Sequence, residues 1–189
     1  MLHSYHVKNM VCDRCIRTVE KAFRAHGVNP NEVRLGVVET SAKVSASALK
    51  QIEDELEKEG FELLKDKEAA TVEQIKTLIV EMIASKEISM LNKNISTILE
   101  LRIGRDYHYL STLFSQTQAV TIARYVILQK IEKAKELLSY GEDSLAAIAK
   151  ALGYSSVHHF SNQFKEVTGM APSNFRSGSF MQRKQLDKV

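Results

Sequence analysis

Two cysteines three positions apart, Cys12 and Cys15, carry the most reactive side chains of the 189-residue chain. Thiolates are soft ligands, and a thiolate pair without carboxylate or imidazole partners selects Cu(I) over harder ions. The chain has no other cysteine, so it cannot build a disulfide framework or a four-cysteine zinc site. The pair therefore predicts a metal site that binds Cu(I), with Zn(II) less favoured. A thiol redox switch and a domain that binds no metal remain open alternatives.

The surroundings of Cys15 predict that its thiol ionises easily. Cys15 falls in the first turn of an expected helix, near Arg14 and Arg17. The positive end of the helix dipole and these cations favour thiolate over thiol. The sequence thus predicts that Cys15 ionises more readily than a free cysteine.

A second set of candidate residues lies in a pattern that repeats at an offset of 50 residues. Asp106 in the first copy corresponds to Ser156 in the second, and both are residue types that cap helix starts. The apolar positions that correspond are Ile95, Ile98, Leu110 and Phe114 with Leu145, Ile148, Phe160 and Phe164. Each copy therefore predicts a short helix, a tight turn and a second helix, which is the helix-turn-helix unit whose second helix can enter the DNA major groove.

The outer faces of the two second helices supply the candidate DNA contacts. Asn and His can hydrogen-bond base edges, Val can touch a thymine methyl group, and Lys can pair with phosphate. The first copy has Ile103 where the second has Gly153 in its turn, and its outer face lacks Arg, Lys and Gln. We therefore expect the first copy mainly to position the protein. The predicted DNA-binding residues are Tyr107, His108, Ser111, Thr112, Ser155, Ser156, Val157, His158, Ser161, Asn162 and Lys165.

Composition agrees with a globular protein that binds DNA. The chain is 44% hydrophobic and 26% charged with two prolines, which argues against disorder. Residues 71–189 hold 15 basic and 11 acidic side chains, so the basic excess lies on the half with the repeat. No stretch approaches the roughly 18 apolar residues of a membrane span, and the start has no signal pattern, so a cytoplasmic location is expected. We see no nucleophile–base pair or phosphate loop and expect no enzyme activity.

The fold class expected is α+β, with an N-terminal ferredoxin-like βαββαβ domain followed by an all-α double helix-turn-helix domain. The domains expected are 1–66, a connecting helix region at 67–91, the double unit at 92–178 and a polar tail at 179–189. The elements expected in the first domain are a strand at 5–7, a helix at 13–26, strands at 33–39 and 41–46, a helix at 48–59 and a strand at 61–64. A capping box at Thr71 and Gln74 predicts a helix start. A helix at 121–140, about 30 Å long at 1.5 Å per residue, joins the two copies.

The C-terminal half resembles the DNA-binding module of AraC-type transcription regulators over roughly residues 72–178. The matching residues are Lys130-Ile131, Ala134, Leu137-Leu138, Ile148-Ala149, Gly153-Tyr154, Phe160, Phe164, Gly169, Pro172 and Phe175-Arg176. The resemblance implies two helix-turn-helix units, joined by a long helix, that enter successive major grooves on one face of the DNA.

The N-terminal half resembles heavy-metal-associated domains over roughly residues 1–65. Met10 precedes Cys12 and Cys15 as in the metal-binding loop of that family, and Asn9 stands where the family usually has glycine. The resemblance implies that the two thiolates bind a soft ion, typically Cu(I), on an exposed loop between a strand and a helix.

The two resemblances together imply a sequence-specific transcription regulator that responds to a thiophilic ion through the helix at 71–85. Its expected partners are double-stranded operator DNA and the transcription machinery; a homodimer is left open, and no membrane is expected. The alternative is a redox-controlled or metal-independent regulator whose first domain serves partner binding or dimerisation.

Overall fold

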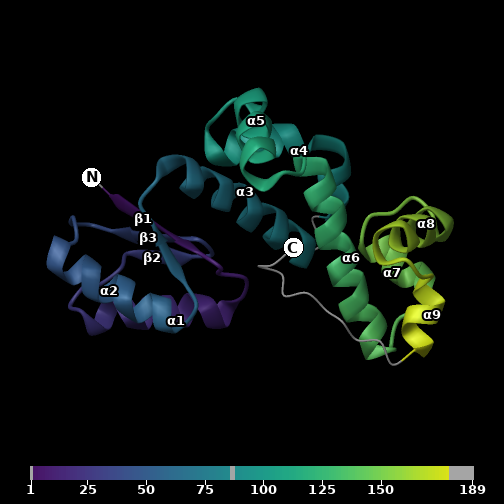
Figure 1. The fold of residues 1–189 in the computed structure, drawn as a ribbon, viewed down its shortest axis with the longest axis horizontal. Helices are drawn as coiled ribbons and strands as arrows, with labels where there is room; N and C mark the ends of the chain where they lie inside the picture. Colours follow the sequence, from purple (N-terminus) through teal and green to yellow (C-terminus); the bar gives the residue numbers. More distant parts are fainter. Residues whose placement is uncertain (1, 86–87, 179–189) are drawn as a thin grey trace. The chain divides into compact units, whose positions relative to one another are not determined.

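A computed structural model describes residues 2–85 and 88–178, although nothing is described of the side chains of residues 88–94. The chain divides into two compact units, residues 1–77 and 78–189, and the division falls inside helix α3 (Figure 1). Among the described residues, no helix combines the length and the apolar character that crossing a bilayer requires.

The first unit contains a four-stranded antiparallel sheet in the order β2-β3-β1-β4. Its elements follow one another as β-α-β-β-α-β: β1 (His3–Lys8), α1 (Asp13–Ala25), β2 (Glu32–Arg34), β3 (Val37–Thr40), α2 (Ala46–Lys58) and β4 (Glu62–Leu64). Alternate residues of β1 and β3, such as Val7 and Val38, are fully buried with Phe23 of α1 and Ile52 of α2. Burial of such apolar side chains, at about 25 cal/mol per Å², holds the two helices on this face of the sheet.

The middle strands differ from the prediction. The segment expected to form one strand at 33–39 contains both β2 and β3, joined by a turn at Leu35 and Gly36. Gly36 has a φ of 76°, a left-handed conformation that glycine adopts without steric cost, and this allows the chain to reverse there. Residues 41–46, expected as a strand, instead lead into α2, which begins at Ala46 with Ser45 as its N-cap.

Helix α3 (Lys67–Ala84) begins earlier than predicted. The carboxylate of Asp66 accepts hydrogen bonds from the backbone N–H groups of Glu68 and Ala69, so Asp66 satisfies the free amides of the first turn. Thr71 lies inside the helix, where its hydroxyl donates to the carbonyl of Lys67. The predicted capping box at Thr71 is therefore wrong, and the helix follows almost directly on β4.

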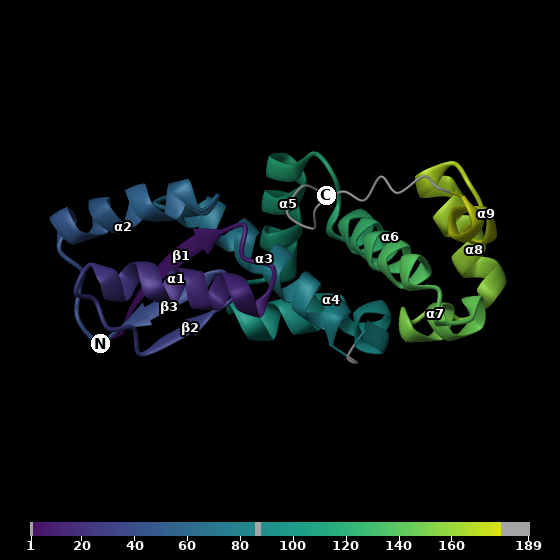
Figure 2. The ribbon, with the colours of Figure 1, turned by 90° about the horizontal axis from the view of Figure 1, so that it is seen from below.

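The second unit is helical throughout its described residues. Its helices are α4 (Ile88–Ile103), α5 (Tyr107–Gln118), α6 (Ile122–Tyr140), α7 (Leu145–Ala151), α8 (Val157–Thr168) and α9 (Pro172–Ser177). Figure 2 shows α7, α8 and α9 grouped along α6, with α5 packed beside its start. The predicted α6 is confirmed, from the Thr121 N-cap to Gly141. Helix α4 is longer than the short helix expected, and the predicted polar tail lies outside the described residues.

Candidate functional site

The loop after β1 places the two cysteines side by side. Cys12 is the N-cap residue of α1 and is exposed, whereas Cys15 lies in the first turn of the helix and is half-buried. Their Sγ atoms are 3.4 Å apart. Within residues 2–85 and 88–178, no group of three or more His, Cys, Asp or Glu side chains is placed to hold a metal. The arrangement therefore provides a pair of sulfur ligands at the surface.

The two thiols differ in acidity, and Cys15 does not follow the prediction. The pKa of Cys12 is lowered, chiefly because the backbone N–H of Cys15 donates to its sulfur, with a smaller contribution from the Arg14 charge. Burial raises the pKa of Cys15, and the neighbouring Cys12 sulfur adds to this effect. The expectation that the surroundings of Cys15 favour its thiolate is therefore wrong. At the N-cap position, the Cys12 sulfur accepts hydrogen bonds from backbone N–H groups of the first helical turn, and these stabilise its thiolate. Cys15, in the first turn itself, faces partly into the protein, where burial disfavours the charged form.

The residues before the cysteines anchor the loop to the sheet. Met10 is 2% exposed, and its Sδ atom accepts a hydrogen bond from the backbone N–H of Gly36 at 3.4 Å. Asn9 has a φ of 72° and donates from Nδ2 to the carbonyl of Gly60 at 2.9 Å. Asparagine tolerates this left-handed conformation better than other non-glycine residues, which explains how it replaces glycine here.

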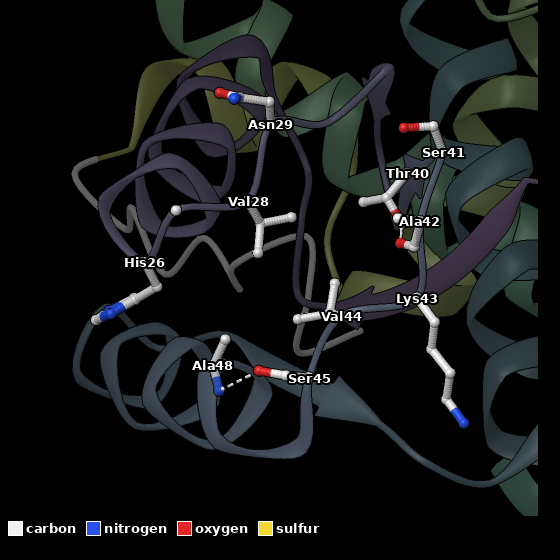
Figure 3. A pocket seen from close by; sticks show the side chains of 11 residues that line it. His26, Val28, Asn29, Thr40, Ser41, Ala42, Lys43, Val44, Ser45 and Ala48 are labelled. Carbon is white, nitrogen blue, oxygen red and sulfur yellow. Dashed lines mark hydrogen bonds between the residues drawn. The ribbon is translucent and has the colours of Figure 1, made fainter.

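A polar hollow of about 370 Å³ lies at the opposite end of the sheet (Figure 3). Thr40 lines it and pairs with His3 at the start of β1, whereas the cysteine loop follows the end of β1. Several polar groups around the hollow are already paired: Thr40 donates to the carbonyl of Ala42, and Ser45 caps α2 by accepting from the amide of Ala48. The hollow is therefore a gap between two loops and is separate from the thiol pair.

In the second unit, α7 and α8 form the predicted second helix-turn-helix. The hydroxyl of Ser156 accepts from the amide of His159 and so starts α8, and Gly153 in the turn has a φ of 72°. Phe160 and Phe164 are fully buried, and their rings lie 5.8 Å apart. These two side chains hold one face of α8 against the unit and determine which residues point away.

The predicted contact residues of α8 lie on its opposite side. Ser155, Ser156, Val157, His158, Asn162 and Lys165 are exposed, and Ser161 is half-buried. His158 Nε2 and Asn162 Nδ2 lie 3.0 Å apart, one helical turn from each other, and form a hydrogen bond that depends on the histidine tautomer. Sequence reasoning did not predict this pairing.

The first helix-turn-helix is α4 with α5. The Asp106 carboxylate accepts from the amides of His108 and Tyr109 and starts α5 as predicted. The turn does contain a glycine, contrary to the prediction from Ile103: Gly104 has a φ of 72°. The repeat is offset by 50 residues at the capping residues but by 49 at the turn glycines, so this turn is one residue shorter.

The predicted contact residues of α5 are less uniformly exposed than those of α8. His108 and Thr112 are exposed, whereas Tyr107 and Ser111 are half-buried. Burial also raises the pKa of the Tyr107 hydroxyl. Tyr109, which was not predicted, is 43% exposed. The observed outer face of α5 carries no charged side chain near its start, in keeping with a positioning role.

A buried cation behind α8 was missed by sequence reasoning. Lys130 of α6 is 3% exposed, and its Nζ lies 5.4 Å from the ring centre of Tyr154. The Tyr154 hydroxyl donates to Gln163 Oε1 at 2.7 Å. Burial lowers the pKa of Lys130 to about 8 and raises the pKa of Tyr154. The helical spacing of Lys130 alone could not distinguish a surface lysine from this one.

The lowered pKa of Lys130 makes stability depend on pH. Below about pH 8 the lysine is charged in both states, and folding must bury that charge. Between about pH 8 and pH 10 the unfolded chain binds more protons, so the free energy of unfolding should rise with pH. We expect Lys130→Met to stabilise the protein at pH 7 by on the order of 1–3 kcal/mol, and by less at pH 9.5. Urea unfolding of both proteins at the two pH values measures this, and a less stable variant at both would contradict it.

Comparison with known proteins identifies the C-terminal part. Residues 101–178 match the family model described as a helix-turn-helix domain. The transcriptional regulator YisR of Bacillus subtilis, itself uncharacterised, is 30% identical over 123 residues, covering 64% of this chain and 39% of YisR. The arabinose operon regulatory protein of Escherichia coli is 36% identical over 69 residues, covering 36% of this chain and 24% of that protein. The chain thus aligns with well under half the length of these relatives.

A solved structure supports the fold of the same part. The C-terminal domain of AraT, a response regulator from Geobacillus stearothermophilus, superposes with a TM-score of 0.52 at 21% identity, covering 64% of this chain and 95% of that domain. The helical C-terminal part of the chain is therefore a helix-turn-helix domain similar to those of AraC-type transcription regulators.

Proposed function

We propose, from the helix-turn-helix domain that residues 101–178 form, that this protein is a sequence-specific transcription regulator whose partner is double-stranded operator DNA. The main support for this proposal is the pair of capped helices α5 and α8, which both pack against α6. At 1.5 Å per residue the 19 residues of α6 span about 28 Å. That length approaches the roughly 34 Å between successive major grooves on one face of DNA. The transcription machinery is a second proposed partner.

Two substitutions on α8 test which residues read bases. Asn162→Ala should cost on the order of 1–3 kcal/mol of operator binding and relax the preference at one base pair, because an amide can pair with an adenine edge. Lys165→Ala should weaken binding to all sequences alike, because phosphate carries no sequence information. Titrations of single-base operator variants measure both, with Asn174→Ala of α9 as the control. Equal effects of Asn162→Ala on every sequence would remove its assignment as a base reader.

We propose further that the first unit is a heavy-metal-associated ferredoxin-like domain and that Cys12 and Cys15 bind a thiophilic ion, Cu(I) in preference to Zn(II). The sheet order β2-β3-β1-β4 with both helices on one face supports the assignment. The adjacent sulfurs fit a soft ion that accepts two ligands, and their surroundings lack the four ligands of structural zinc. Met10 is buried and serves to anchor the loop.

The distance between the sulfurs also favours a second candidate function, a thiol–disulfide switch in a metal-independent regulator. Two thiols 3.4 Å apart need only a small movement to form a disulfide of about 2.05 Å. The two functions differ in their reactant: the switch responds to glutathione disulfide without metal, whereas the metal site responds to Cu(I) under reducing conditions. DNA affinity measured under each condition separates them.

Regulation of either kind requires a path from the thiol loop to the DNA-binding domain. Helix α3 provides one, because its 18 residues begin in the first unit and continue into the second. Its sequence contains no glycine or proline that would interrupt it. We propose that α3 carries the coupling between the thiol loop and the DNA-binding domain. A homodimer interface is the other proposed route.

A further inference from the structure

One side of α3 lies against the sheet of the first unit. Thr77 lies against the turn at Gly36, and Gln74 Nε2 approaches His6 Nδ1 of β1 at 3.5 Å. Glu73, one helical turn before Thr77, contacts the start of the thiol loop. Residues spaced three or four apart share one face of a helix, so these three side chains form a single sheet-facing stripe.

Glu73 makes a contact that joins the helix to the loop. Its Oε1 atom accepts a hydrogen bond from the backbone N–H of Asn9 at 3.2 Å. The residue is only 9% exposed, and Lys76 Nζ lies 3.9 Å from the other carboxylate oxygen. A buried carboxylate is costly unless it is hydrogen-bonded or paired, so these contacts determine where Glu73 lies. A movement of the Asn9 backbone would therefore move or release the carboxylate.

A second contact reaches α3 from the same loop by way of Gly36. The Gly36 amide donates to Met10 Sδ, and its carbonyl accepts from the amide of Val7 at 3.0 Å. A Cβ atom at Gly36 would lie 3.0 Å from Thr77 Oγ1, so the turn and α3 are in close approach. The loop thus touches α3 directly at Glu73 and indirectly at Thr77, one helical turn apart.

The contacts of α3 continue beyond the first unit. Ile79, Met82 and Ile83, in the part of α3 that belongs to the second unit, are buried. From Glu73 to Ile83 the helix rises about 15 Å without interruption. The same helix therefore contains both the contact at Glu73 and buried side chains of the part that belongs to the second unit.

We propose that Glu73 couples the state of the Cys12–Cys15 loop to α3 through its hydrogen bond with the Asn9 amide, an inference that rests on the proposed response to Cu(I). Ligation of the sulfurs constrains the backbone from Asn9 to Cys15, and Glu73 is the first side chain of α3 that this backbone contacts. Glu73 is thus a positioning residue that binds neither the ion nor DNA.

The test compares three variants of the whole 189-residue chain. Glu73→Met keeps the side-chain volume but removes the acceptor, Glu73→Gln keeps an oxygen acceptor without the charge, and Glu68→Gln changes an exposed carboxylate on the same helix. Operator affinity is measured with and without Cu(I) under reducing conditions, together with Cu(I) affinity. We expect Cu(I) to change operator affinity about 5- to 150-fold in the wild type, Glu73→Gln and Glu68→Gln. In Glu73→Met the change should fall below twofold, while Cu(I) affinity and metal-free operator affinity stay within threefold.

Amide hydrogen exchange supplies a readout that does not depend on DNA. The Asn9 amide should exchange at least tenfold faster in Glu73→Met than in Glu73→Gln. Cu(I) should alter exchange at residues 78–84 in the wild type and in Glu73→Gln, but not in Glu73→Met. If Cu(I) leaves wild-type operator affinity unchanged, the proposed metal response fails, and the exchange pattern still decides the role of Glu73. An unchanged Cu(I) effect in a folded Glu73→Met, or equal Asn9 exchange in both Glu73 variants, would overturn the inference.

Discussion

Phe164→Ala is expected to lower the free energy of unfolding of the second unit by about 3–5 kcal/mol and to weaken operator binding with it. The Phe164 ring is fully buried and lies 5.8 Å from the ring of Phe160 and 5.5 Å from that of Phe175. Removing it leaves a cavity where α8 packs against α9. A loss of this size is a large part of the roughly 5–15 kcal/mol that stabilises a domain. The packing that holds α8 in its orientation therefore depends on this residue.

Denaturant unfolding and operator titration together measure this effect. Val157→Ala on the same helix is the control for stability alone, because Val157 is itself a predicted DNA contact, and Asn174→Ala of α9 is the control for operator titration. Val157 is 37% exposed, so its truncation should change stability by no more than about 0.5 kcal/mol. A loss below 1 kcal/mol in Phe164→Ala would show that Phe164 is not part of the core that positions α8. Full operator affinity despite the expected loss of stability would show that α8 does not need this packing to bind.

Replacing both cysteines with serine is expected to abolish Cu(I) binding. Cys12 and Cys15 supply both sulfur ligands, and serine oxygen is a hard donor that a soft ion does not accept in exchange. The wild type should bind one Cu(I) per chain and retain it against Zn(II), whereas the double variant should bind none in competition with a Cu(I)-specific chromophoric chelator.

The free energy of unfolding of the double variant shows whether a loss of Cu(I) binding comes from the missing sulfurs or from a misfolded domain. Cys12 is exposed, and Cys15 is only partly buried where it packs against the cluster around Phe23, so the double variant should unfold within about 2 kcal/mol of the wild type. Equal copper retention by the two proteins would remove the sensing proposal. Tighter binding of Zn(II) than of Cu(I) by the wild type would change the proposed ion.

Sequence patterns predicted best the elements with strong local signals. Each second helix of the repeat begins at the predicted cap, Asp106 or Ser156. The side-chain oxygen of such a residue accepts hydrogen bonds from the free backbone amides two or three residues later, so the signal is local. The core positions Leu110, Phe114 and Phe160 followed from helical spacing, since an apolar face must be buried.

The errors arose where two signals competed. Thr71 fits a capping box, but Asp66 lies five residues earlier and caps a longer helix without any break in periodicity. A run of alternating residues at 33–39 hid a hairpin, because Gly36 can serve either as a strand residue or as a turn with positive φ. The acidity of the two cysteines depends on single hydrogen bonds and on burial, which spacing alone does not specify.

The candidate site was predicted only in part, because local sequence patterns specify helix faces but not contacts between distant residues. The faces of α5 and α8 follow from periodicity, but the bond between His158 and Asn162 and the burial of Lys130 depend on rotamers and on contacts distant in sequence. The Glu73 contact with Asn9 joins residues that are 64 positions apart. Neither the sequence around Asn9 nor the sequence around Glu73 predicts it.

Operator binding by the 189-residue chain as a function of salt tests the central claim most directly. The measurement is the affinity for duplex DNA from the region upstream of its own gene, and for a scrambled duplex of the same length, between about 50 and 200 mM salt. We expect the logarithm of affinity to fall linearly with the logarithm of salt concentration for both duplexes. We also expect the upstream duplex to bind at least about 10³-fold more tightly than the scrambled one. Absence of binding to either duplex at 50 mM salt would contradict the assignment of this protein as a DNA-binding regulator.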